Sequence, residues 1–429
     1  MKYSGKIVIL IAEIRSSLAK RQVFRKIFVY IAQNLTGKLS AHAYVCHLSV
    51  SHTLRGEQVK AADKRVKVSG LATEKGFCQK AFIIGITFEF GKNRAAVFLC
   101  EFMFNELSKM CMDASMELLL IDPKINLRVG KNTPNELFEY ATHMTKKGLG
   151  FPQYCNDDVV VPGLVKLGYD IDDALDYTVA ACWEFIIPGK GADIPNIETM
   201  DFPHIVSDVI TEKLEECDTF SELLDYVKNA IQAECDRKIE NRKSFKNPPL
   251  PLCSIYMDGC TNTLADMYNN GVKYTNFGCH GAGIANAADA LAAVKKAVYD
   301  DKTVDKKELL CALSNNFEGY AKVRNILKSY PKMGNNDDYV DDIAIELMSE
   351  FANDMNNRDN GCGGIWRAGT GSAMEYIWKG EKYPATADGR LAHTPYSSSY
   401  SPSLDANTNG LLSVFKSFTK FDLTNIING

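Results

Sequence analysis

Features that would place this chain in several common classes are missing from its 429 residues. No apolar run is long enough to cross a bilayer. The apolar segment 7–12 follows two lysines as in a signal peptide, but Glu13 interrupts it and no small-residue cleavage site follows. The 13 cysteines include no Cys-x-x-Cys pair, which argues against a disulfide framework. We therefore expect a soluble, cytoplasmic protein with reduced thiols and no membrane anchor.

Acidic residues are scarce near the amino terminus. Residues 1–99 carry 17 Lys and Arg against 5 Asp and Glu, whereas the remainder carries 32 against 48. Clustered basic side chains attract phosphate, but these are scattered and no nucleic-acid-binding motif accompanies them. We do not expect nucleic acid as a partner.

We divide the chain into a basic, atypical segment of unknown fold at 1–102 and a second part at 103–429. A wrongly translated leader explains the first segment equally well.

The second part alternates between strand-like and helix-like patterns. Apolar residues have helical spacing over 103–111, and a strand-like run follows at 117–121. Thr133 and Glu136 have the spacing of a capping box at a helix start. The segment 204–245 has the periodicity of long amphipathic helices. This alternation indicates the α/β class.

A glycine-rich turn at 278–286 leads into a strongly helical segment at 287–294. Gly281 and Gly283 have the spacing of a dinucleotide-binding loop, but Asn286 stands in place of the third glycine. We therefore interpret the turn as part of the framework.

Four cysteine and histidine residues between positions 253 and 280 could bind a metal ion only if folding brought them together. Their spacings lack the short pairs of structural zinc modules, so we assign no metal site. They are Cys253, Cys260, Cys279 and His280.

The most informative pair is Cys182 and Glu184, a thiol and a carboxylate two positions apart. A lone cysteine usually packs as a small hydrophobic residue, and none of the seven histidines has a local signature that would make Cys182 an ordinary nucleophile. Radical chemistry at carbon needs a hydrogen-atom carrier and a proton carrier. A thiyl radical can exchange hydrogen atoms with an activated C–H bond, and a carboxylate can carry the proton.

Three segments in this order resemble the glycyl radical enzymes, the superfamily of pyruvate formate-lyase and of the diol and hydroxyproline dehydratases. They are Gly-Leu-Gly-Phe-Pro-Gln-Tyr-Cys-Asn-Asp at 148–157, the run around Cys-Trp-Glu at 176–189, and Ala-Thr-Ala-Asp-Gly-Arg at 385–390. The resemblance extends over 103–429. It implies part of a ten-stranded α/β barrel, incomplete at both ends, with a finger loop that carries the cysteine.

The resemblance also implies roles for individual residues. Cys182 takes the thiyl position and Glu184 the acid/base position. The family brings a segment near its active site that corresponds here to Phe151, Tyr154, Asn156 and Asp157, although the same residues suit an ordinary turn.

Two positions depart from the family pattern: Ala181 precedes the cysteine where glycine is usual, and Phe185 follows the glutamate where proline is frequent. We expect the side chains of Trp183 and Phe185 to pack in the core instead of touching a substrate. The turn 388–390 is expected to be structural, with Arg390 available to pair with a carboxylate.

Pyruvate formate-lyase carries two adjacent cysteines, which Cys182-Trp183 lacks, so the pattern favours a lyase or dehydratase over an acyltransferase. The family stores its glycyl radical in a C-terminal loop, installed by a radical-SAM activase. We find no such loop before Gly429, expect no cofactor bound by this chain, and expect the portion to be inactive alone. The expected partners are a small-molecule substrate, the activase, and a complementing chain or a second copy. Two alternatives stay open: a pyruvate formate-lyase-like acyltransferase, and a non-catalytic subunit or interaction protein built on a decayed barrel.

Overall fold

The computed structural model describes residues 7–12, 43–48, 96–99, 106–119, 124–180, 183–244 and 246–428. The chain divides into two compact units, Met1–Asp158 and Val159–Gly429, which are described separately. The expected boundary between residues 102 and 103 lies outside the described residues. No helix in the described ranges is long and apolar enough to span a membrane.

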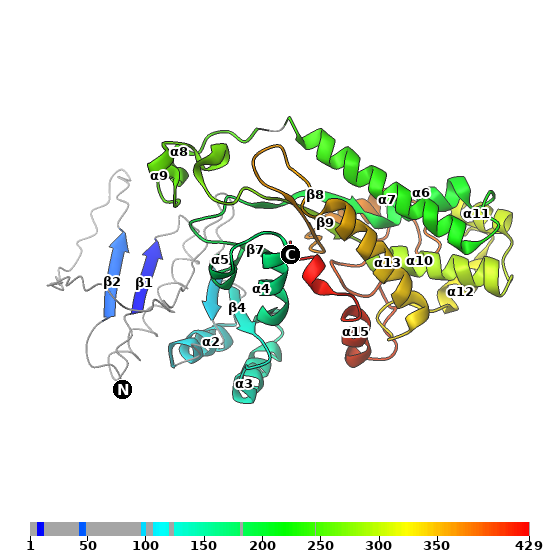
Figure 1. The fold of residues 1–429 in the computed structure, drawn as a ribbon. Coiled ribbons are helices and arrows are strands. Elements are labelled where there is room, and N and C mark those ends of the chain that lie inside the picture. Colours follow the sequence, from blue (N-terminus) through cyan, green and yellow to red (C-terminus); the bar gives the residue numbers. More distant parts are fainter. Residues whose placement is uncertain are drawn as a thin grey trace, which may run out of the picture. The chain divides into compact units, whose positions relative to one another are not determined.

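The first unit contains two small parallel sheets (Figure 1). The central strand of the larger sheet is buried along nearly its whole length, as expected for a strand covered on both faces. One sheet pairs β1 (Ile7–Ala12) with β2 (Ala43–Leu48), and the other has the order β3 (Ala96–Leu99), β4 (Lys124–Val129), β5 (Gln153–Asn156). The helices are α2 (Glu106–Leu118), α3 (Asn135–Thr145) and the start of α4 (Asp157–Lys166).

Two local predictions in this unit are wrong. The strand expected at 117–121 is not formed at its start, because residues 117 and 118 are the last residues of α2 and a turn follows at Leu119 (φ 50°). The capping box at Thr133 is also absent, since α3 begins at Asn135 without a side-chain cap. The Thr133 hydroxyl instead accepts the Gly130 N–H at 2.8 Å, which closes the turn after β4.

The second unit is built on a parallel sheet whose central strand is β9 (Phe277–Ala282), between β8 (Ile194–Asp201) and β10 (Trp366–Gly369). Helices connect these strands, as parallel pairing requires. They are α6 (Phe202–Lys213) and α7 (Phe220–Arg242) after β8, and α10 (Ile284–Val294), α11 (Lys306–Ser314), α12 (Ala321–Ser329) and α13 (Asp338–Met355) after β9. The smaller elements are the rest of α4, α5 (Ile171–Leu175), β6 (Thr178–Ala180), β7 (Glu184–Ile186), α8 (Pro251–Ser254), α9 (Cys260–Thr263), α14 (Glu375–Lys382) and α15 (Leu411–Phe418), with π-helical turns at Met267–Gly271 and Lys295–Asp300 and a 3-10 turn at Leu423–Asn425.

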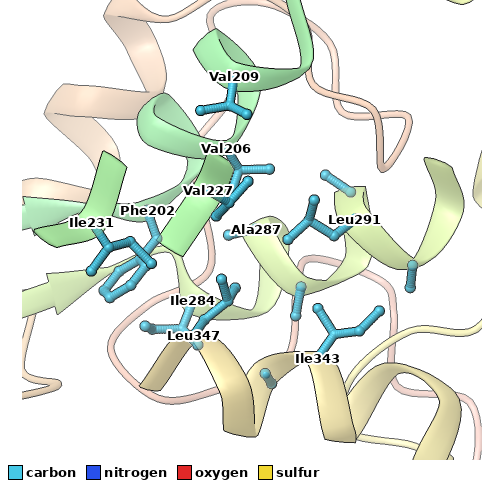
Figure 2. Packing of buried hydrophobic residues seen from close by; sticks show 14 of the residues in the cluster. Phe202, Val206, Val209, Val227, Ile231, Ile284, Ala287, Leu291, Ile343 and Leu347 are labelled. Carbon is cyan, nitrogen blue, oxygen red and sulfur yellow. The ribbon is translucent and has the colours of Figure 1, made fainter. Parts of the chain in front are cut away.

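The long amphipathic helices predicted over 204–245 are present as α6 and α7. Figure 2 shows their apolar side chains facing those of α10 and α13, and Val206, Val227, Leu291 and Leu347 belong to this one buried cluster. These four residues are fully buried. Burial of an apolar side chain of this size contributes about 1.5–3 kcal/mol, so this helix layer fixes the sheet on one side.

The glycine-rich turn has the framework role expected for it. Its first residues form β9, and Gly283 caps α10 with a left-handed backbone (φ 70°). A side chain at Gly283 would meet Pro203 at 2.5 Å, so the position requires glycine for its conformation and for its close contact. Every residue of α10 is buried, and the helix runs through the middle of the core.

One carboxylate lies inside this core. Asp289 of α10 has no exposed surface, and it accepts the N–H of Met333 and the hydroxyl of Ser403, each at 2.7 Å. Burial raises its pKa to about 7, although nearby Lys332 and these two hydrogen bonds oppose the shift. The native protein therefore holds a proton at Asp289 that the unfolded chain loses above about pH 4.

Asp289 is expected to make stability fall as the pH rises from about 4 to about 7. In that window the native state binds more protons than the unfolded state, so the free energy of unfolding decreases, by an amount on the order of 3 kcal/mol. The Asp289→Asn side chain keeps one hydrogen-bond acceptor and one donor but cannot titrate. The free energy of unfolding of this variant should therefore depend less on pH between about 4 and 7. Urea denaturation at a series of pH values measures this effect. An unchanged slope in Asp289→Asn would show that other groups cause the pH dependence.

Candidate active site

The segment with Cys182 and Glu184 is a short antiparallel hairpin. Strand β6 pairs with β7, and Ala180 lies opposite Glu184 in the register. Residues 181–183 therefore connect the two strands, and Cys182 is the middle residue of this connection. Cys182 itself lies outside the described residues, so its role stays a prediction.

The Glu184 side chain is held at the first position of β7. It is 7% exposed, and its Oε2 accepts the backbone N–H of Trp183 at 3.0 Å. Burial of a carboxylate costs free energy unless hydrogen bonds or charges compensate for its lost hydration. The hairpin provides one such donor from its own turn, next to the predicted thiyl position.

The two aromatic neighbours of Glu184 differ from each other. Phe185 is buried as predicted, and its ring meets that of Tyr177 edge-on with centroids 5.4 Å apart. Trp183 was predicted to pack in the core, but it is 37% exposed. The prediction fails because Trp183 lies in the turn before β7 and not within a strand.

Arg367 of β10 connects the base of the hairpin to the sheet. Its guanidinium is fully buried, and Nη1 donates to the carbonyl oxygen of Phe185 at 3.2 Å and to Tyr169 Oη at 2.7 Å. Nη2 donates to Asn428 Oδ1 at 3.1 Å. An Asp193 oxygen lies 3.5 Å from Nη1 and accepts the Tyr169 hydroxyl at 2.7 Å. The buried positive charge is therefore paired and hydrogen-bonded, as a stable buried ion must be.

A second cluster fixes α5, the helix just before β6. Lys190 and Lys273 both pair with the buried carboxylate of Asp173, the latter at 2.7 Å, and Tyr274 Oη donates to it at 2.7 Å. Burial alone raises the pKa of Asp173, but the hydrogen bonds from Lys190, Lys273 and Tyr274 outweigh it and lower the pKa to about 2. The chain is thus anchored on both sides of the hairpin.

The four predicted substrate contacts belong to the first unit, whereas Glu184 belongs to the second. Phe151 is buried in the core of the first unit. Tyr154 packs partly against that core, and its hydroxyl lies 2.9 Å from Thr145 Oγ1. Asn156 Oδ1 accepts the Asp158 N–H at 3.1 Å, which is a side-chain turn at the start of α4.

Asp157 is engaged with Arg128 of β4. The Arg128 Nε and Nη2 donate to the two carboxylate oxygens at 2.8 and 2.9 Å, a bidentate arrangement. The exposed fractions of the two side chains are 8% for Arg128 and 17% for Asp157. A substrate contact by Asp157 therefore has to coexist with this pair, and the role stays a prediction.

Asp157→Asn is expected to destabilise the first unit by about 2 kcal/mol, because it leaves a mostly buried guanidinium without its charged partner. The exposed Glu139→Gln on α3 is a matched control that should change stability little. Urea denaturation of both variants measures the difference. Equal midpoints for Asp157→Asn and the parent would show that the pair contributes nothing to folding.

The turn predicted at 388–390 is present. The Gly389 N–H donates to Thr386 O at 3.0 Å, and Gly389 has φ 90°. The Arg390 guanidinium donates to the carbonyl oxygens of Leu391 and Thr394 at 3.0 and 2.6 Å and to Thr386 Oγ1 at 3.2 Å. Its backbone N–H donates to the Asp388 carboxylate at 3.2 Å. Asp388 accepts the side-chain amide of Asn286 at 2.6 Å.

Among the described residues, no three His, Cys, Asp or Glu side chains form a group that could hold a metal ion. The four cysteine and histidine positions considered from the sequence therefore do not come together as a zinc site.

Comparison with known proteins identifies the family. The model of the pyruvate formate lyase-like family matches residues 101–380, well over half of the chain. The chain belongs to this family of glycyl radical enzymes. Trans-4-hydroxy-L-proline dehydratase from Clostridioides difficile is 32% identical over 339 residues, which are 74% of this chain and 43% of that protein.

Solved structures of glycyl radical enzymes agree with the fold. The glycerol-bound B12-independent glycerol dehydratase from Clostridium butyricum has a TM-score of 0.72 at 28% identity, and hydroxyproline dehydratase from C. difficile with its substrate bound has 0.71 at 30%. Each match covers 76% of this chain and 44% of the other. The chain thus spans less than half the length of the glycyl radical enzymes that it matches.

Sequence reasoning missed Arg367, whose Nη1 donates to the carbonyl oxygen of Phe185 in the hairpin. Its local signal is weak, since an arginine in Trp-Arg-Ala-Gly is an ordinary residue on a strand that faces water. Its partner Phe185 is 182 positions away in the sequence. His280 was considered only as a zinc ligand, and its environment in the sheet was not anticipated.

Proposed function

We propose that this chain forms the thiyl and carboxylate part of a glycyl radical lyase or dehydratase that cleaves a C–C or C–heteroatom bond of a small molecule. The observation that carries the proposal is the hairpin. Glu184 is buried at the first position of β7, and Cys182 is, in the sequence, the middle one of the three residues between β6 and β7. Membership of the glycyl radical enzyme family supports the same assignment.

For a vicinal diol the steps balance as follows. The Cys182 thiyl takes a hydrogen atom from the C–H of one carbinol carbon, which leaves a thiol and a carbon radical. Glu184 accepts the proton of the hydroxyl on that carbon and delivers it to the neighbouring hydroxyl, which leaves as water. The carbon radical of the resulting carbonyl compound then takes the hydrogen atom back from the Cys182 thiol. When present, the glycyl radical of the family generates the thiyl by accepting its hydrogen atom.

The rest of the family assembly is part of the same proposal. The three parallel strands of the second unit would belong to a ten-stranded barrel. A radical-SAM activase would install the glycyl radical in a C-terminal loop of the assembly. Phe151, Tyr154, Asn156 and Asp157 would contribute substrate contacts. Residues outside this chain, in a complementing chain or a second copy, would complete the site.

The test is an anaerobic assay of the full chain, co-expressed with the products of the flanking genes and a radical-SAM activase. The probes are glycerol, 1,2-propanediol and trans-4-hydroxy-L-proline, the compounds after which similar dehydratases are named. Formation of a dehydrated product that depends on Cys182 is the expected result. Turnover that persists in Cys182→Ser would overturn the proposal.

A further inference from the structure

Helices cover one face of the parallel sheet in the second unit, and a different set of side chains lies on the opposite face. Phe277, Cys279 and Trp366 are buried in the helix-side core, and the rings of Phe277 and Trp366 meet edge-on at 5.6 Å. Side chains alternate along a strand, so Gly278 and His280 of β9 lie on the other side.

Arg367 shares this second side. A Cβ at Gly278 would lie 2.2 Å from the Asn428 amide, and Arg367 binds the same amide. Gly278 pairs with Arg367 in the register, and His280 with Gly369. We call the surface formed by Gly278, His280 and Arg367 the polar face. From this face Arg367 donates a hydrogen bond to the carbonyl oxygen of Phe185, the residue that follows Glu184.

His280 has one ring nitrogen engaged and one without a partner. The residue is 5% exposed, and a Cβ at Gly371 would lie 2.7 Å from Nδ1. The hydrogen bond with the Gly371 backbone favours the protonated ring, so Nδ1–H is the donor and the carbonyl oxygen the acceptor. Nε2 is buried and finds no partner in the part of the chain that the structure describes.

The imidazole is neutral under ordinary conditions. Burial lowers the pKa of His280 to about 4, the nearby Arg367 charge acts in the same direction, and the Gly371 hydrogen bond opposes both. With Nδ1 protonated, Nε2 therefore carries a lone pair and acts as a hydrogen-bond acceptor.

Arg367 provides the complementary group. Its Nη atoms are used by Tyr169, Phe185 and Asn428, whereas its buried Nε–H has no partner among the described residues. A buried donor and a buried acceptor thus lie on one face of two neighbouring strands, two residues apart in register. Leaving either one unpaired is costly, and most buried polar groups in proteins have a partner.

We propose that His280 and Arg367 form a binding site for one hydroxyl group of the small-molecule substrate. The hydroxyl oxygen accepts the Arg367 Nε–H, and the hydroxyl proton is donated to His280 Nε2. A hydroxyl can do both at once, while a carboxylate or sulfonate oxygen has no proton to give to Nε2. The site therefore selects compounds that carry a hydroxyl group. This inference rests on the proposed function, because it assigns the ligand to the catalytic hairpin.

The experiment observes His280 directly. The full chain is labelled with 15N in its histidine rings, and the His280 signals are assigned by their loss in His280→Phe. Glycerol, 1,2-propanediol and trans-4-hydroxy-L-proline are the probes, and L-proline is the matched compound without the hydroxyl. We expect a hydroxylated probe to shift the Nε2 resonance upfield, as a new hydrogen-bond donor does, and L-proline to leave it unchanged.

Binding of the same probe to variants provides the second readout. His280→Phe should weaken binding about tenfold, the loss of roughly one good hydrogen bond, and His280→Gln should restore part of it because its amide oxygen can accept. His204→Gln, at an exposed histidine of α6, is the control that should not change binding. Equal affinity of His280→Phe and the parent would overturn the inference.

The outcomes separate this inference from the proposed function. An Nε2 resonance that no probe moves overturns the inference, including the case in which it is already hydrogen-bonded to a buried water. The proposed function still stands in that case if turnover depends on Cys182. Conversely, a shift with a hydroxylated probe supports the site even if Cys182→Ser retains turnover, and then only the catalytic proposal fails.

Discussion

Glu184→Gln is expected to reduce turnover by roughly 10²- to 10⁴-fold, the usual contribution of a general acid–base group. The side chain keeps its size, and its amide oxygen can still accept the Trp183 N–H that Glu184 accepts at 3.0 Å. The hairpin should therefore stay folded while proton transfer is lost. Turnover is measured anaerobically for the assembled enzyme, with the urea midpoint of each variant as the control for folding.

The pH dependence distinguishes a catalytic role of Glu184 from a structural one. If Glu184 transfers the proton, the parent shows a pH–rate limb from this group that is absent in Glu184→Gln. A merely structural carboxylate would lower the amount of folded enzyme and leave the shape of the profile unchanged. An identical profile in both proteins, scaled by a constant, would contradict the acid/base assignment.

Cys182→Ser provides the paired comparison. An O–H bond is much stronger than an S–H bond, so serine cannot exchange a hydrogen atom with a substrate carbon, and turnover should be undetectable. Turnover in Cys182→Ser that exceeds the rate without protein would contradict the thiyl assignment.

The sequence indicates the two candidate reactive residues but not the side chains that support them. Cys182 and Glu184 are candidates because two reactive groups at short spacing lie in one local segment. The hairpin that holds them depends on Arg367, and no local pattern shows that an arginine on β10 lies opposite the Phe185 carbonyl. This contact joins residues 182 positions apart in two different sheets, so it is set by the tertiary fold.

The failed local predictions have a related cause. A short apolar run such as 117–121 fits either a buried strand or the end of a helix, and only its surroundings decide between them. The helix pattern of 204–245 was predicted correctly because it repeats over several turns. Thr133 was a suitable cap by type, but its hydroxyl closes the turn with Gly130, and capping and turn formation compete for the same oxygen.

Arg367→Met is expected to destabilise the second unit by about 3–5 kcal/mol, the cost of removing one partner from a buried ion pair. Methionine has a similar apolar stem but leaves the Asp193 carboxylate, 0% exposed, without its positive partner. Asn428 and the Phe185 carbonyl lose donors at the same time. Arg358→Met, which removes an exposed arginine paired with Asp236, should cost less than about 1 kcal/mol.

A double-mutant cycle shows whether charge is the cause. Asp193→Asn combined with Arg367→Met removes both charges, so the double variant should be more stable than the sum of the single losses predicts, by about 2 kcal/mol. Simple additivity would mean that Arg367 acts through its contacts with Tyr169 and Phe185 and not through Asp193. In either case Arg367→Met should change the environment of Trp183 at the hairpin turn, because the Phe185 carbonyl that Arg367 holds is two residues away. Tryptophan fluorescence of a variant that retains Trp183 as its single tryptophan measures that change while the unit is still folded.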